Sequence, residues 1–164
     1  AVGSASWRGD DGATVAALAA VNCFGSVTLP GQDEVYWAWP LEIGEEFGGA
    51  RPDPARRAAL DDWGPAKLNP GARTQTTLAV VATDADLTRD ETRRLAVMAQ
   101  AGLARAIRPV HAPVDGDVVF ALSGGECALS EPRALDLTRL GALAADCLSR
   151  AVARGVHAAR SEGG

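Results

Sequence analysis

Apolar residues gather in short runs that turn-forming and charged segments separate, a pattern typical of strands with connecting helices. Two early runs, Ser4–Arg8 and Ala13–Asn22, are joined around Asp11 and Gly12, and this dipeptide favours tight turns, so we expect a β-hairpin. The second run is almost entirely apolar, which predicts a strand buried on both faces. The sequence opens within this hairpin pattern, and we therefore expect the chain to represent part of a larger fold.

A strand–helix–strand unit is predicted in the middle of the chain. Thr76–Thr83 is short, apolar and rich in β-branched residues, which favours a strand. Thr88 and Glu91 have the spacing of a capping box, and apolar residues follow at helical spacing until Pro109 ends the helix. Val118–Leu122 is the next predicted strand. A crossover of this kind makes the two strands parallel.

The remaining segments predict one further helix and a long, irregular excursion. Apolar residues repeat at helical spacing over Asp136–His157. Between residues 31 and 73 the pattern loosens, with a short strand expected at Val35–Trp39 and a short helix at Pro54–Asp62. Ser123–Glu126 is expected to form a turn. Together the elements predict a single α/β domain.

Composition and charge narrow the classes of function. The 164 residues carry a net charge of −5, which argues against a nucleic-acid partner, and no apolar run approaches the length of a membrane span. The three cysteines, at 23, 127 and 147, are odd in number and have no CxxC spacing, which argues against a disulfide framework. We therefore expect the protein in the reducing cytoplasm. Without paired histidines or a glycine-rich phosphate loop, we expect neither a metal nor a nucleotide cofactor.

The parallel crossover predicts where polar side chains meet. It places Thr76 beside Asp115 and Asp117, because the first residues of parallel strands share one edge of the sheet. An antiparallel neighbour ending at Asn22 would bring a carboxamide to the same edge. A hydroxyl, two carboxylates and an amide suit acyl transfer, with a nucleophile, orienting acids and an oxyanion donor.

Each of these residues also has a purely structural interpretation. A threonine that opens a strand is a common β-former, and Asp-Gly-Asp and a strand-ending Asn22 are common turn sequences. His111 lies near the same edge, where it is either a general base or a structural or solvated loop residue. Only the predicted meeting point favours the functional interpretation.

Several blocks of the sequence resemble one enzyme family. They are QTTLAVVAT at Gln75–Thr83, LAVMAQAGLARAIRPVHAPVDGDVVFAL, GSASWRGDDGATVAALAAVNCFGSV and PLEIGEEFGG. These blocks are similar to the family that contains L-aminopeptidase/D-esterase, the β-aminopeptidases and the nylon-oligomer (6-aminohexanoate-oligomer) hydrolase. The resemblance implies an αββα sandwich of the N-terminal-nucleophile type, in which a precursor cleaves its own backbone.

The resemblance also assigns roles to residues. It implies that the bond between Gln75 and Thr76 is cleaved and that Thr76 is the nucleophile. Asp115 and Asp117 would orient and activate it, and Asn22 would help to form the oxyanion hole. Threonine followed by Asp-Gly-Asp favours the nylon-oligomer branch, although glutamine replaces that branch's asparagine before the scissile bond.

Family members are about twice as long as this chain. The resemblance therefore implies that residues 1–75 are the C-terminal part of the α segment, and that residues 76–164 are the β segment. The absent N-terminal segment of the same precursor would be a partner, and assembly into a homotetramer is expected.

The expected activity is hydrolysis of linear amides, such as nylon oligomers or peptides, through an acyl-enzyme. Two other activities stay open at this point: acyl transfer of the ornithine acetyltransferase type, and aminopeptidase or esterase action on N-terminal amino acids. The chain by itself is also consistent with an inactive half of a fold that awaits its complement.

Overall fold

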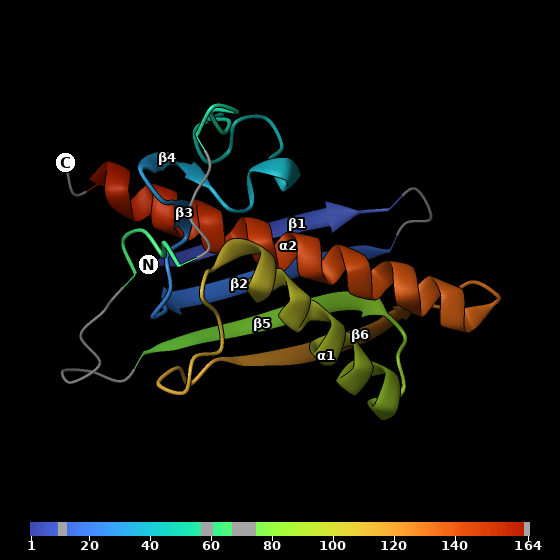
Figure 1. Cartoon of the computed structure of the whole chain (residues 1–164). Helices are drawn as coiled ribbons and strands as arrows, with labels where there is room; N and C mark the ends of the chain where they lie inside the picture. Colours follow the sequence, from blue (N-terminus) through green and yellow to red (C-terminus); the bar gives the residue numbers. More distant parts are fainter. Residues whose placement is uncertain (10–12, 57–60, 67–74, 163–164) are drawn as a thin grey trace.

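The computed structural model describes residues 1–9, 13–56, 61–66 and 75–162 (Figure 1). The Asp11–Gly12 turn and the centre of the helix expected at Pro54–Asp62 lie outside these residues. The elements are β1 (Val2–Arg8), β2 (Thr14–Asn22), β3 (Thr28–Leu29), β4 (Gln32–Tyr36), a 3-10 helix (Trp39–Leu41), β5 (Thr76–Ala85), α1 (Arg89–Ala106), β6 (Val118–Cys127) and α2 (Arg133–Glu162).

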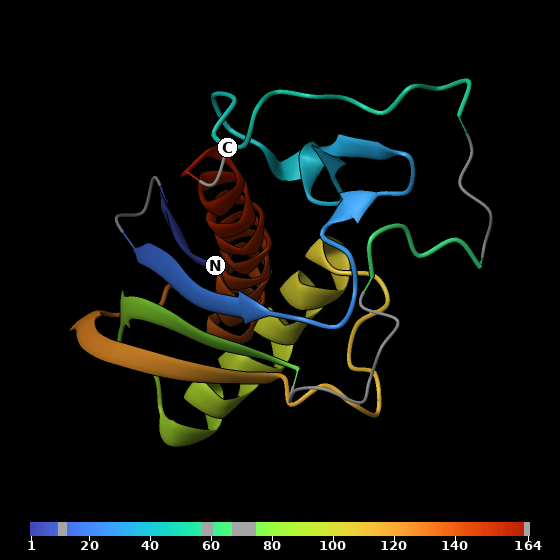
Figure 2. The ribbon, with the colours of Figure 1, turned by 90° about the vertical axis from the view of Figure 1, so that its left-hand side faces the viewer.

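The main sheet has the strand order β1-β2-β5-β6. β1 pairs antiparallel with β2, β2 pairs antiparallel with β5, and β5 pairs parallel with β6, so the predicted hairpin and crossover are both confirmed. α1 and α2 lie on the same side of this sheet (Figure 2). β3 and β4 form a separate pair near the C-terminal end of α2 (Figure 1).

The core lies between the sheet and the two helices. Alternate residues of β2, from Val15 to Val21, are buried there, and Leu95, Leu103 and Leu148 fill it from α1 and α2. The expectation that β2 is buried on both faces is wrong for this chain, because Leu18 is 48% exposed. Its apolar residues lie on two faces, and the helices cover only one.

The uncovered side of the sheet, here called the open face, is apolar. Its most exposed large side chains are 48–65% accessible to solvent; they are Val2, Leu18, Leu78, Phe120 and Leu122. Exposed apolar patches on this scale mark contact surfaces rather than ordinary protein exterior. No described element covers this face (Figure 2).

A pair of glycines allows β1 to approach α2 closely. A Cβ added to Gly3 would overlap the backbone of Ala151 and Gly155, and one added to Gly155 would lie 2.7 Å from the Gly3 nitrogen. Real Cβ atoms do not approach backbone this closely, so the spacing of strand and helix depends on both glycines.

None of the described helices has the length and apolarity required to cross a membrane.

Several predicted boundaries shift in the structure. The capping box of Thr88 and Glu91 forms as predicted and starts α1 at Arg89. The strand expected at Val35–Trp39 is instead β4, which ends at Tyr36, and the following 3-10 helix contains Pro40 in its first turn, where proline is tolerated.

Two elements are longer than predicted. The turn expected at Ser123–Glu126 is wrong, because β6 continues to Cys127 with an irregularity in its pairing to β5. Gly125, whose φ is +75°, lets the chain make that bulge without breaking the strand. α2 extends beyond the predicted Asp136–His157 at both ends.

A short helix was expected at Pro54–Asp62. Residues 54 and 55 form a turn, so the described start of that segment is not helical.

Candidate active site

The antiparallel register of β2 and β5 places Asn22 directly opposite Thr76. Side chains alternate along a strand, and the neighbours Val21 and Thr77 are buried against the helices. Thr76 and Asn22 therefore project to the open face, with Asn22 exposed. The sequence prediction that these two residues meet at one sheet edge is confirmed.

The carbonyl of Gln75 lies at the centre of this edge. The Thr76 hydroxyl donates a hydrogen bond to the Gln75 carbonyl oxygen at 2.6 Å, and the Gly116 backbone N–H donates to the same oxygen at 2.8 Å. Gln75 also forms a parallel bridge with Asp115. The Gly116 N–H on this oxygen can stabilise the negative charge that develops there when the carbonyl carbon is attacked, and the Thr76 hydroxyl lies beside the same carbonyl.

Gly116 is a participant that the sequence reasoning missed. A Cβ at this position would lie 2.9 Å from the Thr76 hydroxyl oxygen and 3.6 Å from the Gln75 carbonyl oxygen. Only glycine therefore leaves both atoms undisturbed at their present distances. The glycine between the two aspartates was the available signal, but a sequence alone also allows it to be an ordinary turn residue.

Both aspartates accept hydrogen bonds from backbone groups around the site. Asp115 accepts hydrogen bonds from the backbone N–H of Phe24 at 3.0 Å and of Ala112 at 3.2 Å, which joins the end of β2 to the turn before β6. Asp117 accepts one from the Thr77 backbone N–H at 2.9 Å. The predicted proximity of both aspartates to Thr76 is confirmed, and the Asp117 contact holds the backbone of the residue that follows it.

His111 belongs to the same group of residues. Its Nδ1 lies 3.0 Å from Oδ2 of Asp117, whose side chain is only 2% exposed, whereas that of His111 is 43% exposed. An ionised carboxylate can only accept, so it pairs with the histidine tautomer that carries a proton on Nδ1. The backbone of His111 has a φ of +53°, in the left-handed region. The sequence left open whether His111 is a general base or a structural or solvated loop residue. Its contact with Asp117 shows that it is not simply solvated.

An apolar hollow of about 240 Å³ follows the site along the open face. Ala20 and Leu78, which are cross-strand partners, line it two residues beyond Asn22 and Thr76. Phe120 and Val2 complete its walls from the edge strands. The nucleophile candidate thus stands at one end of an apolar surface.

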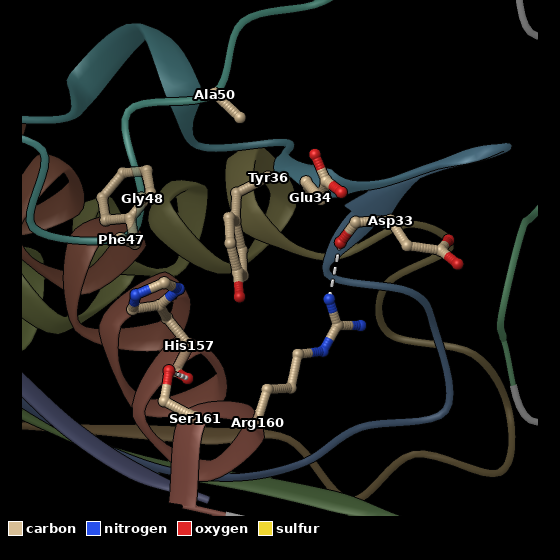
Figure 3. A pocket seen from close by; sticks show the side chains of 9 residues that line it. All are labelled: Asp33, Glu34, Tyr36, Phe47, Gly48, Ala50, His157, Arg160 and Ser161. Carbon is tan, nitrogen blue, oxygen red and sulfur yellow. Dashed lines mark hydrogen bonds between the residues drawn. The ribbon is translucent and has the colours of Figure 1, made fainter. Parts of the chain in front are cut away.

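A larger pocket of about 390 Å³ lies elsewhere, between β4, the loop after the 3-10 helix and the end of α2 (Figure 3). The Tyr36 side chain points between His157 and Arg160, and Arg160 donates a hydrogen bond to the Asp33 carbonyl at 2.6 Å (Figure 3). Burial raises the pKa of the Tyr36 phenol, although Arg160 opposes this shift. None of the residues predicted for the active site lines this pocket.

Among the described residues, no three His, Cys, Asp or Glu side chains are arranged to hold a metal ion. Cys147 is unsuited to nucleophilic chemistry, because burial raises the pKa of its thiol to about 11.

Comparisons with solved structures identify the fold. The chain is similar to the β-aminopeptidase of Burkholderia sp., with 21% identity, a TM-score of 0.55, and coverage of 94% of this chain and 41% of that one. It is also similar to the L-aminopeptidase D-Ala-esterase/amidase of Ochrobactrum anthropi, described as a variant of the Ntn hydrolase fold, with 20% identity, a TM-score of 0.56, and coverage of 95% and 40%. The expected αββα fold of the N-terminal-nucleophile type is confirmed, and this chain supplies its C-terminal portion. The division at residue 75 stays a prediction.

Sequence relatives identify the family. Uncharacterized aminopeptidases of Mycobacterium tuberculosis and Mycobacterium leprae are each 40% identical, over 164 and 179 aligned residues. The alignments cover 94% and 99% of this chain but 47% and 46% of those proteins, so the chain spans about half of their length. Residues 1–164 match the model of peptidase family S58 from end to end, and the chain belongs to that family.

Proposed function

We propose that this chain is the nucleophile-bearing part of a self-processing amide hydrolase, with Thr76 as the nucleophile. The observation that carries the proposal is the hydrogen bond from the Thr76 hydroxyl to the carbonyl of its own preceding residue, Gln75. The Gly116 N–H holds that carbonyl oxygen from another direction. A nucleophile and an oxyanion donor thus converge on one peptide bond.

Self-processing follows from this arrangement in two balanced steps. Thr76 Oγ attacks the Gln75 carbonyl carbon, a C–O bond forms, the peptide C–N bond breaks, and the hydroxyl proton passes to the released nitrogen. Water then hydrolyses the ester, which leaves a carboxylate on Gln75 and restores the hydroxyl of Thr76, whose α-amine the first step has already freed.

In the mature enzyme the freed α-amine serves as the base for the same hydroxyl. Thr76 Oγ attacks the amide carbonyl of the substrate, the amine product leaves with a proton, and water releases the acid from the acyl-enzyme. In this proposal Asn22, which pairs with Thr76 across the strands, donates to the oxyanion of the substrate, and Asp115 and Asp117 keep the backbone around the site in position.

The substrate in this proposal is a linear amide with an apolar acyl portion. The hollow lined by Ala20, Leu78 and Phe120 begins two residues from Thr76 on the same face and suits such a group. The names of the mycobacterial relatives favour an aminopeptidase, so amides of N-terminal amino acids come first and nylon oligomers second.

The open face also indicates how the enzyme is completed. We propose that the segment corresponding to the other half of the relatives packs on this face and covers the hollow, because the chain spans only about half of their length. Leu122, which is exposed outside the hollow, then becomes part of a second core, while Leu78 and Phe120 line an enclosed pocket between the two halves. Assembly of the completed protein into a homotetramer remains a prediction, which light scattering measures.

The test is intact-mass measurement after expression of the full-length protein. The expected result is a break between Gln75 and Thr76 in the wild type and an unbroken, inactive chain in Thr76→Ala. Assays with p-nitroanilides of α- and β-amino acids, and with 6-aminohexanoate oligomers, then rank the substrates. Adding an acceptor amine separates hydrolysis from acyl transfer through the ratio of free acid to acylated amine. A cleaved and active Thr76→Ala protein contradicts the proposal.

A further inference from the structure

We infer that His111 is a positioning residue that acts through Asp117 on the backbone of the nucleophile. The inference rests on the proposed function of Thr76. The chain of contacts is direct: His111 Nδ1 lies 3.0 Å from one carboxylate oxygen of Asp117, and the other oxygen accepts from the Thr77 N–H at 2.9 Å. Thr77 follows the nucleophile, so the imidazole and the strand carrying Thr76 are held by one carboxylate.

Burial explains why Asp117 needs this partner. Its side chain is 2% exposed, and a carboxylate removed from water requires hydrogen bonds to both oxygens. The Thr77 N–H supplies one of them, and His111, which is 43% exposed, supplies the other from the rim. Loss of the imidazole would leave Oδ2 without this donor, and the carboxylate would turn towards water. Its hold on Thr77 would then weaken.

The backbone of His111 has a conformation that is uncommon for residues other than glycine. Its φ of +53° lies in the left-handed region, which only a few per cent of non-glycine residues occupy, although histidine enters it more often than most. Such strain persists where the surroundings enforce it, and it clusters at functional sites. The neighbouring Ala112 N–H donates to Asp115 at 3.2 Å, so the second aspartate of the motif fixes the same turn.

Three substitutions separate the side chain from the backbone. His111→Gly removes both the strain and the donor, and His111→Ala removes the donor while keeping the strain. His111→Asn adopts positive φ readily and retains an N–H donor. If the imidazole acts through its hydrogen bond to Asp117, Gly and Ala lose activity alike and Asn recovers most of it.

The measurements are the first-order rate of Gln75–Thr76 cleavage in the full-length protein, and kcat and KM of the processed enzyme. For His111→Gly and His111→Ala we expect a fall in cleavage rate and kcat of about 10- to 100-fold with KM nearly unchanged, the size of one hydrogen bond to a buried charge. The cleavage rate and kcat of His111→Asn should stay within roughly 5-fold of the wild-type values. His157→Asn, at the other histidine of the chain, is the matched control and should change neither rate.

A double-mutant cycle with Asp117→Asn keeps the test decisive if single variants are unstable. In the Asp117→Asn background, His111→Ala should have little further effect, because the contact is already broken. Wild-type rates for His111→Gly, or fully additive effects in the cycle, would overturn the inference. An active Thr76→Ala protein would instead overturn the proposed function, so the two failures are distinguishable.

Discussion

Replacing Gly116 with alanine tests the geometry at the scissile bond. The added Cβ would lie 2.9 Å from the Thr76 hydroxyl oxygen and 3.6 Å from the Gln75 carbonyl oxygen. The first distance is too short for a stable contact, so the hydroxyl must move. The Gly116 N–H can still donate to the Gln75 carbonyl, because the backbone at this position needs no glycine conformation. The substitution therefore displaces the proposed nucleophile and leaves the proposed oxyanion donor in place.

The expected magnitude follows from the displacement. Moving the hydroxyl oxygen to ordinary contact distance requires a shift of about 0.5 Å, or a change to another χ1 rotamer, and threonine has few of these. A misplacement of about 1 Å costs on the order of 100-fold in rate, so a loss of roughly 10- to 100-fold is expected. Stability should change little, because Gly116 is exposed.

The assay is a time course of Gln75–Thr76 cleavage by intact mass, with the melting temperature measured on an uncleaved Thr76→Ala background. Thr76→Ser is the matched second substitution, because serine lacks the γ-methyl group and rotates more freely. The double variant Thr76→Ser/Gly116→Ala should therefore recover part of the rate that Gly116→Ala loses. Cleavage of Gly116→Ala at the wild-type rate would refute this account of the site.

Three further predictions concern the remaining contacts. Asn22→Ala should lower kcat by about 100- to 1000-fold if it donates to the oxyanion, whereas Asn22→Asp with unchanged kcat would argue against that role. Gly3→Ala should lower the free energy of unfolding by about 1–3 kcal/mol in a denaturant titration, because its Cβ meets the backbone of α2. The bidentate Arg133 contact, with help from the capping box, lowers the pKa of Glu91 from 4.5 to about 2. The stability that Glu91 contributes should thus be complete above pH 4.5 and be lost as the pH falls through 2, so the difference between wild type and Glu91→Gln in unfolding titrations should shrink over that range.

The arrangement of the site was largely predictable, because it follows from topology. Once Thr76–Thr83 and Val118–Leu122 are parallel strands, their first residues must share an edge, and the Asp-Gly-Asp segment directly precedes the second strand. The meeting of Asn22 with Thr76 followed from an antiparallel neighbour strand that ends at the edge where β5 begins. Which residues meet at this edge depends on strand direction and register, and both can be inferred from the hydrophobic pattern.

Details that depend on tertiary contacts were not predictable. The extension of β6 through Gly124 and Gly125 depends on a bulge that the neighbouring strand allows, whereas the sequence alone favours a turn. The role of the Gly116 N–H and the positive φ of His111 are backbone properties, which leave no periodic signal. The apolar pattern of β2 predicted two buried faces, whereas the described residues cover only one of them.

Because one side of the sheet is apolar and uncovered, the stability of the chain should depend on the concentration of whatever partner covers that side. A surface with side chains as exposed as Val2, Phe120 and Leu122 gains free energy from any apolar partner, including a second copy of itself. The midpoint of unfolding of the 164-residue chain should therefore rise with its own concentration, as for subunits whose folding and association are linked. A covalently attached complement would instead present a fixed effective concentration, and dilution would no longer matter.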